Sequence, residues 1–203
     1  MVDERCSTSW PVLAQWDSLR TRLGANFLIC CIIELNMAYR NKTYVAFDGD
    51  NDMWAYQYMK GWKQNDNSTF NFYDAHGLSQ ARDTSTEESI KRSLRERLSN
   101  SKVFVTLVGE HTKGLYKFVR WEVEQAINLN MPIIVVNLNK KRGHDDVYCP
   151  PILDKHLAVH ISYNARIMQH ALENWPSEYY TLSREGASGP RHYGKPVYHG
   201  YGL

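Results

Sequence analysis

From residue 43 onward, short apolar runs alternate with longer segments in which apolar residues recur at helical spacing. Such alternation is typical of a parallel β-sheet whose strands are joined by crossover helices. Five strand–helix units predict a flavodoxin-like, doubly wound α/β fold: a five-stranded parallel sheet between two helical layers, in strand order 2-1-3-4-5. The apolar runs are residues 43–47, 70–74, 102–109, 132–138 and 157–161.

Individual segments add detail to this prediction. Ser85 and Glu88 have capping-box spacing ahead of a helix in which Ile90, Leu94 and Leu98 recur every four residues. The run "KVFVTLVG" is apolar throughout, which favours a central strand buried on both faces. The shorter run at 70–74 is expected near an edge of the sheet.

The two ends of the chain lack this alternation. Residues 1–36 are interpreted as an N-terminal extension, and one hypothesis places the natural translation start at Met37. The α/β domain is expected to span residues 37–176, with its last helix from Asn164 to Trp175. Residues 177–203 are rich in Gly, Pro and Tyr without apolar periodicity, so an irregular or disordered tail is predicted.

Charge and cysteine content exclude several functional classes. The net charge is +2, with acidic and basic residues spread along the chain, so neither nucleic acid nor a membrane is expected as a partner. Cys6, Cys30, Cys31 and Cys149 show no C-x-x-C spacing, so reduced thiols are expected and no metal site is predicted. The longest apolar run is far shorter than the roughly 20 residues of a membrane span, and a cytoplasmic location is the expectation.

Candidate chemistry gathers where the first three strands end, because doubly wound sheets bind ligands at the carboxyl ends of their strands. The loops there read "FDGDND", "FYDAHG" and "GEHTKG". The acidic loop is typical of a magnesium-binding phospho-receiver, but no aspartate ends the third strand, which disfavours that chemistry. A plainer interpretation is a polar turn in which Asn51 or Asp52 caps the next helix. No phosphate-binding or dinucleotide glycine motif follows any strand.

Two glutamates on the helix after the third strand are candidates for a catalytic carboxylate. Val119, Val123, Ala126 and Ile127 define the buried stripe of this helix on a 100° wheel. Glu122 and Glu124 flank Val123 on opposite sides. Periodicity therefore leaves both open, and a solvated flank position is the ordinary interpretation of each.

The stretch "VGEHTKG" and the stretch "RWEVEQAINLNMPII" carry a resemblance to a known family. Together with "YVAFDGDND", they are similar to the TIR-like proteins typified by ThsB of the bacterial Thoeris antiphage system, over about residues 43–175. The essential glutamate of TIR enzymes precedes an apolar residue and stands four before a small one. That pattern selects Glu122, followed by Val123 and Ala126. Glu124 fits a looser W-x-x-E pattern and stays the second candidate.

The resemblance implies cleavage of NAD at the nicotinamide–ribose bond and cyclisation of the ADP-ribose part into a messenger that activates a partner effector. NAD is then the substrate, no separate cofactor is expected, and assembly into homo-oligomers is a further expectation. Phe47 is the preferred residue for stacking on a planar ring, ahead of Trp54, Tyr73 and Trp121, and His111 or Asp48 could orient the cyclising group. The expected substrate-binding residues are Phe47, Asp48, Asp50, Tyr73, Gly109, Glu110, His111 and Trp121.

Two other functional classes stay open on the sequence. Many TIR folds are non-catalytic interaction modules, and "KFVRWEVE" departs from the longer S-x-W-C-x-x-E form of the enzymes. A nucleoside-processing transferase would use the same carboxylate chemistry on a related sheet. The products distinguish the three classes: nicotinamide, a free nucleobase, or neither.

Overall fold

The computed structural model describes residues 42–65, 70, 72–74, 86–114 and 118–203. The expectation of an N-terminal extension over residues 1–36 falls outside these residues. Among the described residues, no helix combines the length and the apolar character needed to cross a membrane.

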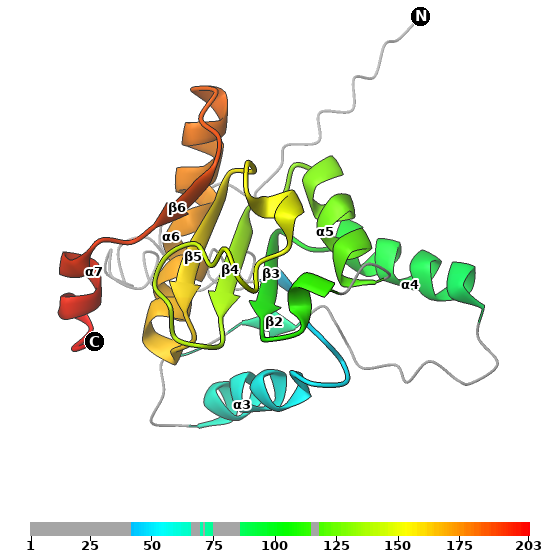
Figure 1. Ribbon diagram of the computed structural model, residues 1–203, viewed down its shortest axis with the longest axis horizontal. Helices are drawn as coiled ribbons and strands as arrows, with labels where there is room; N and C mark the ends of the chain where they lie inside the picture. Colours follow the sequence, from blue (N-terminus) through cyan, green and yellow to red (C-terminus); the bar gives the residue numbers. More distant parts are fainter. Residues whose placement is uncertain (1–41, 66–69, 71, 75–85, 115–117) are drawn as a thin grey trace, which may run out of the picture. The chain divides into compact units, whose positions relative to one another are not determined.

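In the described part of the chain the sheet has six strands, all parallel, in the order β2-β1-β3-β4-β5-β6 (Figure 1). The predicted 2-1-3-4-5 order and flavodoxin-like class are confirmed, and β6 is an addition beside β5. The strand β2 is a two-residue edge strand, as its short apolar run indicates. The bounds are β1 Lys42–Ala46, β2 Tyr73–Asp74, β3 Val103–Val108, β4 Ile133–Asn137, β5 Ala158–Ser162 and β6 Pro190–His192.

Helices cover both faces of the sheet, which gives the predicted three layers. Side chains of α3 and α6 pack into the core on one face, and side chains of α4, α5 and the short 3-10 turn η2 pack into the core on the other. Because β3 and β4 lie between these layers, every residue of both strands is buried. The bounds are α3 Met53–Gln64, α4 Glu87–Ser99, η1 Thr112–Gly114, α5 Val119–Asn128, η2 Pro151–Leu153, α6 Ala165–Arg184 and α7 Lys195–Gly200.

The start of α4 differs from the predicted capping box. Thr86 is the N-cap, and its hydroxyl oxygen accepts a hydrogen bond from the backbone N–H of Ser89 at 3.3 Å. Ser85, the predicted cap, lies outside the described residues. The helix therefore begins within a residue or two of the predicted position, with a hydroxyl cap of the expected kind.

The prediction of an irregular tail over residues 177–203 is wrong. The helix α6 continues through Pro176 to Arg184, and β6 and α7 follow. Aromatic side chains explain the order: Tyr179 of α6 is buried in the core, and Tyr198 of α7 is fully buried. The hydroxyl of Tyr198 also accepts a hydrogen bond from the N–H of Ser162 at the end of β5, at 3.2 Å. Glycine and proline content thus misled the sequence interpretation, because the tyrosines between them supply the buried area.

Candidate functional site

The loops that follow β1, β3 and β4 form a cavity at the carboxyl edge of the sheet. Its volume is about 410 Å³, which lies within the usual range for small-molecule pockets. The lining residues come from the start of α3, the turn after β3 and the segment after β4. They are Asn51, Asp52, Trp54, Gly109, Glu110, His111, Leu138, Asn139 and Tyr148.

The loop after β1 is organised by Asp48. This residue is only 3% exposed, and its carboxylate accepts hydrogen bonds from the N–H of Asp50 at 3.0 Å and from Asn51 Nδ2 at 2.7 Å. Asp50 itself is exposed. The oxygens of Asp48 are therefore engaged by their own turn, as in the plainer interpretation of the acidic loop.

Asp52 links the first loop to the third. It occupies the N-cap position of α3, as the capping interpretation expects, but its side chain makes no cap hydrogen bond. Instead its Oδ2 accepts from the hydroxyl of Thr112 at 3.4 Å, while that hydroxyl oxygen accepts from the N–H of Gly109 at 2.8 Å. Burial and the neighbouring Asp48 raise the pKa of Asp52.

Gly109 is required by this close approach. A Cβ at residue 109 would lie 2.6 Å from Cγ of Asp52, well inside van der Waals contact. Glycine at the end of β3 therefore allows the carboxylate of Asp52 to pack against the backbone, and it brings the next two residues, Glu110 and His111, to the cavity.

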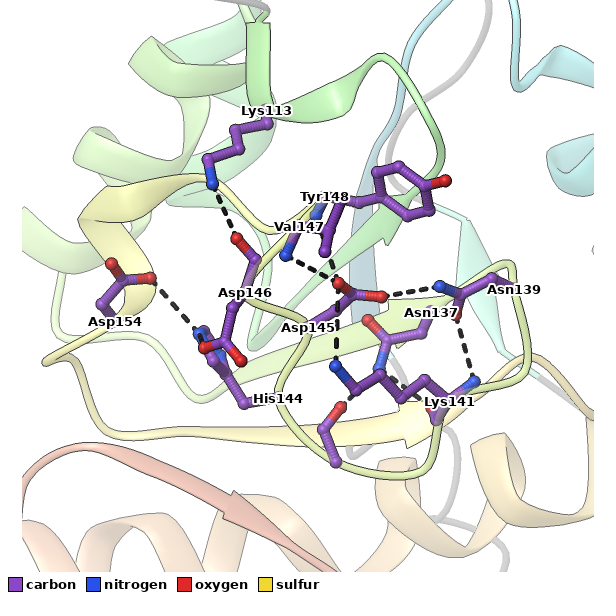
Figure 2. A network of polar contacts seen from close by, with 11 residues as sticks. Lys113, Asn137, Asn139, Lys141, His144, Asp145, Asp146, Val147, Tyr148 and Asp154 are labelled. Carbon is purple, nitrogen blue, oxygen red and sulfur yellow. Dashed lines mark hydrogen bonds and ion pairs between the residues drawn. The ribbon is translucent and has the colours of Figure 1, made fainter.

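The segment after β4 forms the third wall, and sequence reasoning missed it because only the first three loops were considered. Figure 2 shows the carboxylate of Asp145 at the centre of this segment. It accepts from Asn139 Nδ2 at 2.6 Å and from the N–H groups of Val147 and Tyr148 at 2.9 and 3.2 Å. Burial opposes ionisation of Asp145, but these hydrogen bonds and the charge of Lys141 lower its pKa on balance. The sequence signal available for this wall was Asn137 at the end of β4 together with Asn139 just after it.

The aromatic candidates lie in different surroundings. Phe47 is buried and stacks on Tyr56 at a centroid distance of 4.7 Å, so one face of its ring is covered. Trp54 is 48% exposed and lines the cavity, which makes it the aromatic candidate with a ring available there. Trp121 lies on α5, with Lys91 and Arg95 of α4 over its ring. The side chain of Tyr73 lies outside the part of the protein that the structure describes.

Glu122 lies in the first turn of α5 and is only 5% exposed. The hydroxyl of Tyr44, on β1, donates a hydrogen bond to its Oε1 at 2.5 Å. Burial raises the pKa of Glu122 to about 7, although the hydrogen bond from Tyr44 opposes part of that rise. At neutral pH the carboxyl group therefore exists in both protonation states.

Glu124 has the opposite environment. Its side chain is 39% exposed and pairs with Arg120, one turn earlier, at 3.0 Å. It lines a second cavity of about 510 Å³ together with Ile152, Lys155 and His156. Of the two carboxylates that periodicity left open, Glu122 is the buried one and Glu124 is a surface residue.

The structure thus brings together some of the sequence-predicted site residues and separates others. Gly109, Glu110 and His111 share the cavity at the carboxyl edge with residues of two other loops. The predicted residues that do not line that cavity are Phe47, Asp48, Asp50, Trp121 and Glu122.

The strand order and the cavity at the carboxyl edge define a flavodoxin-like α/β protein with a candidate ligand site. Comparison with known protein families shows to which family this α/β domain is related. Residues 44–143, about half of the chain, match the family model described as Thoeris protein ThsB, TIR-like domain. This part of the chain belongs to that family, and the match supports a Thoeris antiphage defence protein.

Proposed function

We propose that the protein is a TIR-like signalling enzyme that cleaves NAD at the nicotinamide–ribose bond. The ADP-ribose part is then cyclised into a messenger that activates a partner effector. The observation that carries the proposal is the buried carboxylate of Glu122, which lies within the segment matched by the ThsB TIR-like family. A cyclic product in place of simple hydrolysis follows from the resemblance alone.

The chemistry needs a carboxylate in such surroundings. Breaking the bond to nicotinamide builds positive charge on the ribose, and a fixed anion in a poorly hydrated site stabilises that charge far more than it would in water. The nicotinamide ring of NAD is already cationic, so it leaves as a neutral molecule without a general acid. A cationic ring near Glu122 would also favour the ionised form of a carboxyl group whose pKa is about 7.

Tyr44 has the role of a positioning residue in this proposal. Its ring is fully buried and stacks on Phe104 of β3 at a centroid distance of 5.7 Å. Its hydroxyl therefore has a fixed position from which it donates to Oε1 of Glu122. The other carboxylate oxygen is left without this contact and is the one assigned to the ribose.

The cavity at the carboxyl edge has a separate role. Glu122 is not among its lining residues, so we assign the cavity to substrate binding and not to bond cleavage. The indole of Trp54 offers a surface for a planar ring, and Asp52 and Asn139 offer oxygen and nitrogen atoms for ribose hydroxyls. Under this assignment, variants of the cavity should change substrate binding and variants of Glu122 should change the rate of bond cleavage, so kinetic measurements can separate the two.

The test compares the wild-type chain with Glu122→Gln and Glu124→Gln. Nicotinamide and nucleotide products of NAD are measured by mass spectrometry, both with purified protein and in cells challenged with phage. We expect release of nicotinamide and a cyclic ADP-ribose isomer from the wild type and from Glu124→Gln, and a loss of at least about 100-fold for Glu122→Gln.

Other outcomes would contradict the proposal. Full activity of Glu122→Gln would remove the assigned carboxylate. If wild type releases no nicotinamide with any trigger, a non-catalytic interaction module is the better description. Release of a free nucleobase from deoxynucleosides would indicate a transferase instead.

A further inference from the structure

Three potential metal ligands meet between the segment after β4 and the strand β5. They are His144 and Cys149 from the segment, and His160 from the middle of β5. One ligand atom from each residue lies within 4.8 Å of the other two. None of the three residues has a part in the proposed NAD chemistry.

Three of the four ring nitrogens of this cluster have no hydrogen-bond partner among the described residues, although buried polar groups normally have one. His160 is 0% exposed, and neither of its ring nitrogens has a partner among the described residues. Nδ1 of His144 is also buried and has no partner in the part of the chain that the structure describes, and Cys149 is a buried free thiol. Burying such groups unsatisfied is costly, which calls for a ligand that the described residues do not supply.

The protonation state of His160 suits coordination of a cation. Burial, together with the nearby His144 and His192, lowers the pKa of His160 to about 3, so its imidazole is neutral at physiological pH. Neutral imidazole is the form that binds metals. Burial also raises the pKa of the Cys149 thiol to about 12, with Asp154 and Asp145 adding to the effect. A divalent cation would reverse that effect by stabilising the thiolate.

The geometry of these three residues points to a site for one zinc ion, and we propose that His144, Cys149 and His160 are its ligands. A thiolate with two imidazoles is a donor set that zinc prefers, whereas magnesium and calcium take oxygen ligands. Zinc–nitrogen and zinc–sulfur bonds of about 2.0 to 2.3 Å place tetrahedral ligand atoms about 3.5 Å apart. Closing the cluster from separations of up to 4.8 Å needs side-chain shifts on the order of 1 Å.

The binding step balances without any redox partner. Cys149 releases its thiol proton to solvent, a sulfur–zinc bond replaces the sulfur–hydrogen bond, and the metal stays in the +2 state. The two histidines bind through the lone pairs of neutral imidazole rings. The three ligands leave the fourth tetrahedral position for a water molecule or a carboxylate.

His144 is already oriented for this role. Its Nε2 lies 3.4 Å from Oδ1 of both Asp146 and Asp154, and Figure 2 shows these contacts. Carboxylates paired with the outer nitrogen of a histidine are usual in zinc sites, because they fix the ring and increase the basicity of the ligating nitrogen. With Nε2 facing the acids, the unpartnered Nδ1 is the atom assigned to the metal.

The protein framework also holds Cys149 in place. The N–H of Cys149 donates to the carbonyl of Asp145 at 3.0 Å, within the turn that the Asp145 carboxylate organises. Lys113 Nζ donates to the carbonyl of Asp146 at 2.6 Å and ties the segment to the turn after β3 (Figure 2). A zinc ion would also attach the segment to β5 through His160. Because Asn139 and Tyr148 belong to the same segment, the metal would fix one wall of the cavity.

The first experiment measures metal content of the untagged full-length chain by inductively coupled plasma mass spectrometry. After incubation with zinc and removal of excess metal, we expect about one zinc per chain. Cys149→Ser, His144→Gln and His160→Gln should each bind zinc at least about tenfold more weakly. His199→Gln, at an exposed residue of α7, is the matched control and should bind zinc like the wild type.

A second measurement needs no variant and so remains valid if the variants fail to fold. Replacing zinc by Co²⁺ in the wild type should give a thiolate-to-cobalt charge-transfer band and the visible bands of a tetrahedral site. A chelator should lower the wild-type Tm, and zinc but not magnesium should restore it. The proposal is overturned if the wild type binds no zinc, binds iron or copper in its place, lacks the thiolate band with cobalt, or keeps its zinc when all three ligands are replaced.

Discussion

Replacing Glu122 by glutamine should change stability in a way that depends on pH. Burial raises the pKa of this carboxyl group from 4.5 to about 7 in the folded chain. Below about pH 4.5 both the folded and the unfolded chain carry the proton, so the group costs no stability. Between these two pKa values the unfolded chain ionises first and holds fewer protons, so stability falls as pH rises. Above about pH 7 the loss is complete.

The size of the effect follows from the pKa difference. One pKa unit corresponds to about 1.4 kcal/mol, so the wild type should lose up to about 3 kcal/mol of unfolding free energy between pH 4.5 and pH 7. Glutamine does not titrate, and its carbonyl oxygen can still accept the hydrogen bond from Tyr44. Its amide N–H groups can cost about 1 to 3 kcal/mol if they lack acceptors, but that cost is the same at every pH.

Urea unfolding, followed by tryptophan fluorescence at intervals from pH 4 to pH 8.5, measures this dependence. The difference in unfolding free energy between Glu122→Gln and the wild type should move in favour of the variant as pH rises. Glu124→Gln is the matched control, since it removes an exposed pair with Arg120 worth less than about 1 kcal/mol and should show no such trend. Parallel pH profiles for wild type and Glu122→Gln would refute the reasoning.

This stability assay also clarifies the functional one. A Glu122→Gln chain that is folded at pH 8, gains stability relative to the wild type with rising pH, and releases no nicotinamide would keep its fold and lose only its chemistry. The wild type would then hold an ionisable group in its interior at a cost in stability, as enzymes commonly do at catalytic residues. The same variant with undiminished nicotinamide release would make Glu122 a structural residue.

Further predictions concern the cavity, the C-terminal segment and the positioning of Glu122. Gly109→Ala should destabilise the fold by about 1 to 3 kcal/mol in urea unfolding, because the added Cβ meets the buried carboxylate of Asp52. Gly49→Ala, with open space at the Cβ, is the control and should have little effect. Equal effects of the two substitutions would contradict the close approach of Asp52 to residue 109. Tyr198→Ala should cost about 3 to 5 kcal/mol by the same assay, and a cost near zero would contradict the ordered C-terminal segment. Tyr44→Phe removes the hydrogen bond that lowers the pKa of Glu122. The fall in unfolding free energy with rising pH should therefore end above about pH 7, where the wild-type fall ends. An unchanged end point would exclude that hydrogen bond as a control of the pKa.

The sheet could be predicted from sequence because its strands are buried on both faces. Apolar runs at 102–109 and 132–138 leave little choice of structure, and β3 and β4 lie within a residue or two of the predicted bounds. The C-terminal segment could not be predicted in this way. Its order depends on single aromatic side chains, such as Tyr198, that reach a distant strand, and no periodic pattern records such contacts.

The candidate site depends on long-range contacts in the same way. A helical wheel places Glu122 and Glu124 symmetrically about the buried stripe, so it gives them equal weight. What separates them is Tyr44, a residue of β1 that lies 78 positions earlier in the chain. The position of Tyr44 within an apolar strand predicts that its ring is buried. The partner of its hydroxyl, however, follows only from the packing of α5 against the sheet.

The two groups of buried polar side chains on which the proposals depend share one side of the sheet. Tyr44, the partner of Glu122, and Cys149 both belong to the core formed with α4, α5 and η2. His160 alternates along β5 with Val159 and Ile161, which pack into the opposite core. Burial of ionisable groups conflicts with the stability of an apolar core, and such conflicts are concentrated at functional sites. At Glu122 a hydrogen bond and a raised pKa reduce the cost. At His160 the protein atoms supply no hydrogen bond to either ring nitrogen among the described residues, and a bound cation would complete the site.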